Sequence, residues 1–178
     1  MKRLLTAISA ILMTSPMAVA STTLEDHQAL WRELQSVGVT IRVNDPKHCQ
    51  GLGGGSYHSA YRTLSICQDN ATQPNQQVQW TLNDLDTLRH EAHHVIQDCA
   101  DGRAFDGQLV PYHDTKEDYT SFVNRMPGAK IKAVMNNYIN DLGVSDDVVI
   151  LELEAFSAAD SVSARNIAAA VRSACGVL

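Results

Sequence analysis

The amino-acid sequence predicts a small α+β domain, in which a short mixed or antiparallel sheet packs on one helix and the C-terminal half is helical. Two segments rich in β-forming residues, 39–43 and 62–67, are the strand candidates. An apolar pattern of helical period runs from about 81 to 99. From 146 to 174 the chain contains no Gly or Pro and many Ala, which favours one long C-terminal helix.

The first 20 residues have the order of a cleavable signal peptide. Two basic residues precede a short apolar run at 4–13, and small residues stand before the expected cut after Ala20. Polar residues end the apolar run well before the roughly 20 residues that a membrane-spanning helix needs. We therefore expect a secreted or periplasmic protein whose single mature domain comprises 21–178, with no membrane association after cleavage.

The charge of the mature chain limits its partners. Residues 21–178 contain 12 basic and 20 acidic residues, a formal net charge of −8. Nucleic acids and anionic lipid surfaces are bound by clustered Lys and Arg, which this composition does not supply. The balance argues against a nucleic acid or a membrane surface as partner.

The N-terminal half supplies the expected sheet. An amphipathic helix is predicted over 24–37, followed by the strand at 39–43. The Gly-rich segment 51–57, GLGGGSY, lacks the spacing of a phosphate-binding loop and is interpreted as a flexible turn before the strand at 62–67. A polar loop at 68–79 then leads to the next helix.

The C-terminal half is predicted to be helical apart from one irregular loop at 100–113, where Gly and Pro are frequent. Asp114 and Glu117 have the spacing of a capping box for a helix that ends near 125. Apolar residues of helical period predict another helix over 131–142.

The four cysteines all follow the expected leader, and an even number in an exported chain predicts two disulfides. We favour Cys49 with Cys67, which closes a compact loop, and Cys99 with Cys175, which ties a helix end to the C-terminus. Zinc binding by these thiols is disfavoured because the chain has no C-x-x-C pair.

The segment TLRHEAHHVIQDC, 87–99, contains the spacing H-E-x-x-H at His90, Glu91 and His94. On a helix, residues four apart lie on one face, so the two imidazoles can bind one zinc ion. Glu91 lies about 100° round the helix and can flank the ion without binding it. A carboxylate there can accept a proton from zinc-bound water, whose pKa is about 7. Residue frequencies predict about 0.01 chance occurrences of this motif in such a chain.

The segment resembles the active-site helix of the zincin metallopeptidases. The resemblance implies that His90 and His94 bind zinc and that Glu91 is the general base. In metzincins the motif extends to a further Gly and His, but this chain has Gln97 and Ala100 there, which excludes that branch. The resemblance is to a compact, minimal form of the gluzincin type, in which a Glu from a later helix completes the metal site.

The segment LELEAFSAAD, 151–160, is similar to the later gluzincin element. It implies Glu152 as the third zinc ligand, with Glu154 as the runner-up on a different face of the helix. The segment departs from the pattern at Phe156, where Asp or Asn often supplies a partner for one histidine. Asp160 is an alternative source of that partner.

Other polar residues offer alternative roles. His113, Asp106 and Asp114 are rival third ligands, and His113 or Tyr112 could steady the oxyanion of a tetrahedral intermediate. His93 matches no position of the motif and is interpreted as either packed behind the ligands or exposed. Three further histidines lack partner spacing and are expected at the surface: His27, His48 and His58.

The resemblance implies zinc-dependent hydrolysis of peptide bonds, with a peptide or protein as substrate and Zn²⁺ as cofactor. It also implies an antiparallel edge strand above the active-site helix that pairs with an extended peptide, a position that 62–67 could fill. The alternative is a non-catalytic secreted binding protein that zinc stabilises. A disulfide-linked binding module without metal is a third hypothesis.

Overall fold

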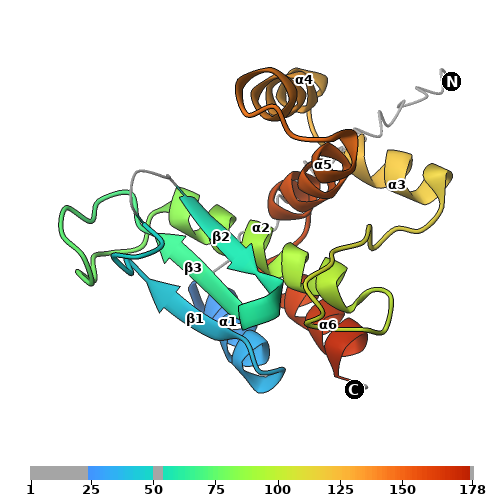
Figure 1. The fold of residues 1–178 in the computed structure, drawn as a ribbon. Helices are drawn as coiled ribbons and strands as arrows, with labels where there is room; N and C mark the ends of the chain where they lie inside the picture. Colours follow the sequence, from blue (N-terminus) through green and yellow to red (C-terminus); the bar gives the residue numbers. More distant parts are fainter. Residues whose placement is uncertain (1–23, 50–53, 177–178) are drawn as a thin grey trace, which may run out of the picture.

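The computed structural model of the protein describes residues 24–49 and 54–176 (Figure 1). The expected signal peptide and its cleavage site lie outside these residues. The described chain is α+β, as predicted, and its elements in order are α1 (Leu24–Ser36), β1 (Thr40–Val43), β2 (Gly54–His58), a 3₁₀ turn η1 (Ser59–Tyr61), β3 (Thr63–Cys67), α2 (Leu82–Cys99), α3 (Lys116–Val123), α4 (Gly128–Asn136), a π-helical turn η2 (Asn137–Asp141), α5 (Asp146–Ser161) and α6 (Ala164–Cys175). None of these helices is both long and apolar enough to cross a membrane.

The three described strands form a mixed sheet in the order β1-β3-β2. β3 is central, parallel to β1 and antiparallel to β2. The prediction that 62–67 supplies an exposed edge strand is therefore wrong. Because β3 is fully paired on both sides, its backbone is not open to a peptide, and the edge beside α2 belongs to β2 instead.

The Gly-rich segment was predicted to be a turn, but its second half is the strand β2. A Cβ atom at Gly55 would lie 2.7 Å from the Ser65 carbonyl oxygen, 2.8 Å from Thr87 Cγ2 and 3.0 Å from Glu91 Cγ. Gly is thus required by the close approach of β2 to both β3 and α2. The glycines bring the sheet edge onto the helix that carries the H-E-x-x-H motif.

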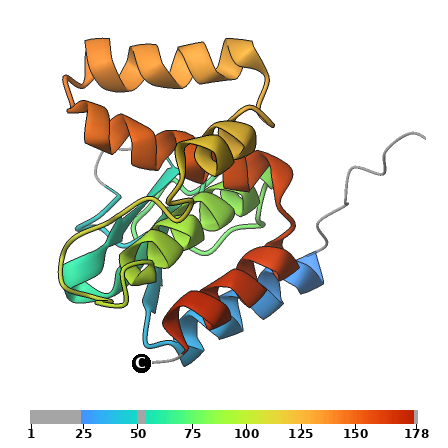
Figure 2. The same ribbon diagram turned by 90° about the vertical axis from the view of Figure 1, so that its right-hand side faces the viewer.

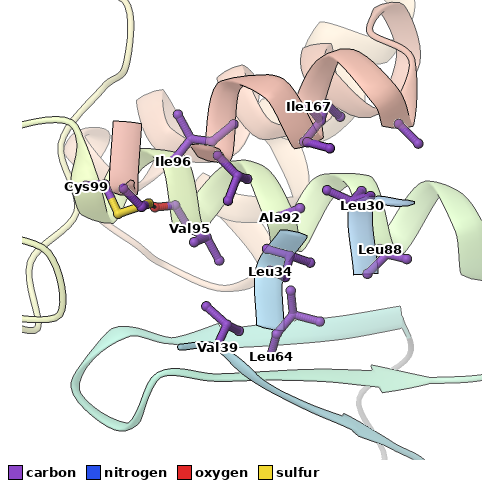
Figure 3. Close-up of a cluster of buried hydrophobic side chains, with 14 of the residues drawn as sticks. Leu30, Leu34, Val39, Leu64, Leu88, Ala92, Val95, Ile96, Cys99 and Ile167 are labelled. Atoms are coloured by element: carbon purple, nitrogen blue, oxygen red, sulfur yellow. Dashed lines mark hydrogen bonds between the residues drawn. A yellow bond between two sulfur atoms is a disulfide. The ribbon is translucent and has the colours of Figure 1, made fainter. Parts of the chain in front are cut away.

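Helix α2 lies at the centre of the fold and contacts the sheet, α5 and α6. Figure 2 shows α1 and α6 side by side beneath α2, while α4 lies along the outer side of α5 at the opposite end. In Figure 3, apolar side chains of α2 meet those of α1, β3 and α6; the labelled residues include Leu30, Leu34, Leu64, Leu88, Ala92, Val95, Ile96 and Ile167. This core fixes the apolar face of α2 and leaves its polar face toward α5 and β2.

The C-terminal half is helical, but its helices differ from the predicted ones. The single helix expected over 146–174 is two helices, because Val162 is extended and the Ser163 side chain caps α6 by accepting from the Asn166 backbone N–H. A Ser side chain that bonds to nearby backbone favours a helix start over a helix interior. Likewise, α3 is capped by Thr115 rather than by the Asp114 capping box that the sequence suggested.

Both predicted disulfides are present, Cys49–Cys67 and Cys99–Cys175. The described residues contain no free cysteine. The first bond joins the segment that follows β1 to the last residue of β3, and the second joins the last residue of α2 to the last residue of α6. Two disulfides are compatible with an extracellular protein.

Removing the Cys99–Cys175 disulfide is expected to lower the free energy of unfolding by about 4 kcal/mol, because this bond closes the longer loop and restricts the unfolded chain most. Its two cysteines are 76 residues apart, against 18 for Cys49–Cys67. Urea unfolding of the two double Cys→Ala variants would measure both losses. An equal or larger loss in the Cys49/Cys67 variant would contradict the loop-entropy argument.

Candidate metal centre

The structure brings His90, His94 and Glu152 together, as the sequence predicted. Their ligand atoms all lie within 4.8 Å of one another. The two histidine Nε2 atoms are 3.1 Å apart, and the Glu152 carboxylate lies 3.2 Å from the His90 Nε2 and 3.5 Å from that of His94. Within the described ranges this is the one such group of His, Cys, Asp and Glu.

Two helices position these side chains. Helix α2 begins at a capping box, in which the Thr81 side chain accepts from the Asp84 backbone N–H and the Asp84 carboxylate accepts from the Thr81 backbone N–H. The spacing of four residues then places His90 and His94 one turn apart on the same face. Helix α5 packs against that face and contributes Glu152.

The donor set fits a divalent metal ion. Both histidines are buried, and Glu152 Oε2 is buried without a hydrogen-bond partner in the described part of the chain. A buried carboxylate oxygen is costly unless a partner compensates it. Two imidazole nitrogens and one carboxylate oxygen are the protein ligands of many catalytic zinc sites, which keep a fourth position open.

Electrostatics keep Glu152 ionised. Burial raises its pKa, but the adjacent His90 and His94 rings outweigh this and hold the pKa well below its ordinary value. Burial also lowers the pKa of His94, but the hydrogen bond and charge of Glu152 prevail and raise it to about 9. For His90 burial prevails and lowers the pKa to about 4. The group therefore holds a carboxylate beside two ring nitrogens.

Glu91 flanks this group from the next position of α2. Burial raises the pKa of its carboxyl to about 7, while the charge of His94 acts in the opposite direction. Its side chain is packed against β2 at Gly55. His90 and Glu91 line a cavity of about 390 Å³, which is also lined by Lys130, Tyr138 and Phe156.

Tyr138 is a site residue that the sequence analysis missed. It lies on the π-helical turn η2, where π-helical geometry is often associated with function. Burial and the nearby charge of Glu152 raise the pKa of its phenol. The hydroxyl therefore stays protonated and can donate a hydrogen bond. Helical periodicity alone had assigned Tyr138 to the apolar face of the helix expected over 131–142.

The runner-up ligand Glu154 lies behind the group. Its carboxylate is fully buried and accepts hydrogen bonds from His113 Nδ1 at 2.6 Å and from the backbone N–H groups of Tyr112 and His113 at 3.0 and 2.9 Å. His113 and Tyr112 are thus anchored to Glu154 and do not line the cavity beside His90. Asp106 and Asp114, the other rival ligands, are exposed.

The other histidines divide into buried and exposed ones. His93 is buried, stacked near Phe122, and its Nε2 is 3.3 Å from Glu154 Oε2. The expectation that His27 lies at the surface is wrong: its side chain is buried, with Nε2 2.9 Å from Arg89 Nη1. His58 is exposed, as expected, and His48 is partly buried beside Asp45.

The departure at Phe156 has a structural consequence for His90. The two rings pack with their centroids 4.4 Å apart, and the buried His90 Nδ1 has no hydrogen-bond partner among the described residues. Asp160, the suggested alternative partner, pairs with Lys130 instead. The Nδ1 of His90 therefore lacks the polar partner that the family pattern supplies, and the ring packs on an apolar side chain instead.

No protein-family model, curated protein or solved structure matches this chain. The functional argument consequently depends on the residues and geometry described above.

Proposed function

We propose that the chain is a zinc-dependent metallopeptidase of the gluzincin type, with the metal held by His90, His94 and Glu152. The observation that carries the proposal is the convergence of these three side chains from α2 and α5, with Glu91 adjacent and a cavity alongside. The ligands match the zinc donor set in type and number. The H-E-x-x-H spacing gives the general base a defined position relative to them.

Zinc at this site would polarise the scissile carbonyl and lower the pKa of the attacking water. Glu91 accepts the proton of that water and delivers it to the leaving amine, so it acts first as general base and then as general acid. Tyr138 lines the same cavity and could donate a hydrogen bond to the oxyanion.

The outer edge of β2 is the proposed place for the peptide substrate. It is the exposed edge of the sheet that lies against α2, and its glycines bring the strand close to Glu91. An extended peptide can pair with such an edge through main-chain hydrogen bonds. The disulfides and the leader-like first 20 residues support a secreted or periplasmic location for this activity.

The direct test is digestion of a peptide library by the purified protein, with and without a chelator. We expect cutting that stops with chelator and returns when zinc is added, together with about one zinc per chain by elemental analysis. Cutting that the chelator leaves unchanged would remove zinc from the mechanism. A protein that contains no metal and cuts no peptide would instead favour the metal-free binding module.

A further inference from the structure

Gln97 lies one turn beyond His94 on α2 and is completely buried. Its amide oxygen faces the His94 ring, with Oε1 2.7 Å from Nδ1. Its amide nitrogen donates to the Leu151 carbonyl oxygen at 3.0 Å and to Glu154 Oε2 at 2.8 Å. Gln97 therefore connects a proposed metal ligand on α2 with two acceptors on α5.

The chemistry of these neighbours determines which way the amide points. A backbone carbonyl and an ionised carboxylate can only accept hydrogen bonds, so both must face the NH₂ group of Gln97. The reversed amide would place its oxygen against two acceptors. The oxygen must therefore face His94, and His94 must donate from Nδ1.

Glu154 is itself held in the orientation that this requires. Its Oε2 accepts hydrogen bonds from the Gln97 amide nitrogen at 2.8 Å and from the Tyr112 backbone N–H at 3.0 Å. Its other oxygen, Oε1, accepts hydrogen bonds from the backbone N–H and from Nδ1 of His113. The carboxylate is thus an acceptor only, and it is fixed between α2, α5 and the loop that precedes α3.

We infer that Gln97, oriented by Glu154, is a positioning residue that keeps the proton of His94 on Nδ1 and so presents Nε2 to the metal. This inference rests on the proposed zinc site. His90 has no equivalent, since its Nδ1 lacks a partner in the described chain and its ring packs on Phe156. The two histidine ligands are therefore unequal, and the protein fixes the proton position only at His94.

Long-range ¹H–¹⁵N NMR spectra of ¹⁵N-histidine-labelled protein test the proton position directly, because they distinguish the two ring nitrogens. We expect Nδ1 of His94 to carry the proton in the zinc-loaded protein, and also in the metal-free protein at a pH above the His94 pKa of about 9, where the neutral ring holds a single proton. A His94 whose Nδ1 lacks a proton in either form would overturn the inference, whatever the protein hydrolyses.

Zinc affinity tests the role of Gln97. Gln97→Met keeps the size of the side chain and removes its three polar contacts. We expect it to weaken zinc binding about 10–100-fold, as the loss of a residue that hydrogen-bonds to a metal-bound histidine typically does. The matched control is Ser157→Ala on α5, which removes a buried hydrogen bond to the Phe122 carbonyl oxygen without touching a ligand. Unchanged zinc affinity in a folded Gln97→Met protein would contradict the inference, as would an equal loss in the control.

If the wild type binds no zinc, the proposed function fails, but the spectra of the metal-free protein still test the position of the proton.

Discussion

Glu91→Gln is expected to lower kcat for peptide hydrolysis about 10²–10⁴-fold while zinc remains bound, since removing a general base costs roughly this much. The amide keeps the size of the side chain but cannot accept the proton of the attacking water. Because Glu91 lies beside the metal group and is not part of it, the three ligands stay in place. Steady-state kinetics with a peptide substrate and zinc content per chain are the two measurements.

The same substitution at an exposed position is the control for this experiment. Glu117→Gln on α3 changes a carboxylate to an amide far from the metal group and should leave both kcat and zinc content unchanged. If zinc only stabilises a binding protein, Glu91→Gln should alter no activity. Retained hydrolysis in a zinc-loaded Glu91→Gln protein would remove Glu91 from the mechanism.

Glu152→Gln is expected to weaken zinc binding by about 100-fold or more and to remove hydrolysis with it. Even the loss of a residue that only hydrogen-bonds to a metal ligand lowers metal affinity about 10–100-fold, and Glu152 is itself a proposed ligand. The substitution removes the only carboxylate of the metal group and leaves two imidazoles. Competition with a fluorescent zinc chelator would measure the affinity. Circular dichroism would show that the variant is folded, because Glu152 is only partly buried.

Glu154→Gln is the matched comparison for Glu152→Gln, since it makes the same chemical change two residues later on the same helix. Glu154 reaches the metal group only through Gln97, so we expect a loss of no more than about tenfold in zinc affinity. The opposite order, with zinc lost in Glu154→Gln and kept in Glu152→Gln, would show that the runner-up is the ligand.

The sequence predicted correctly that His90, His94 and Glu152 come together, because the pattern that predicts it is local. The spacing of His90 and His94 follows directly from helical geometry, and the segment 151–160 supplies Glu152. The reason given for Glu152 was less accurate. Helical periodicity placed Glu152 inward and Glu154 on another face, yet Glu154 is fully buried and Glu152 is only partly so. Helix α5 is covered by α2 on one side and by α3 and α4 on others, so a single inward face does not describe it.

The features that sequence reasoning missed depend on tertiary contacts. β2 has no alternating apolar pattern, because its glycines are required by the approach of α2 rather than by burial on one face. The role of Gln97 depends on Glu154, 57 residues later, and on the direction of an amide that no local pattern reveals. Tyr138 enters the cavity because the chain between α4 and α5 turns back over α5, a path that periodicity cannot specify.

Helix α2 is anchored at both ends. The Thr81–Asp84 contacts secure its first turn, and the bond from Cys99 to α6 secures its last residue. We therefore expect α2 to move little when a substrate binds. Any widening of the cavity that admits a bulky peptide is expected on the side of α4 and η2, which lie at the outside of the molecule (Figure 2).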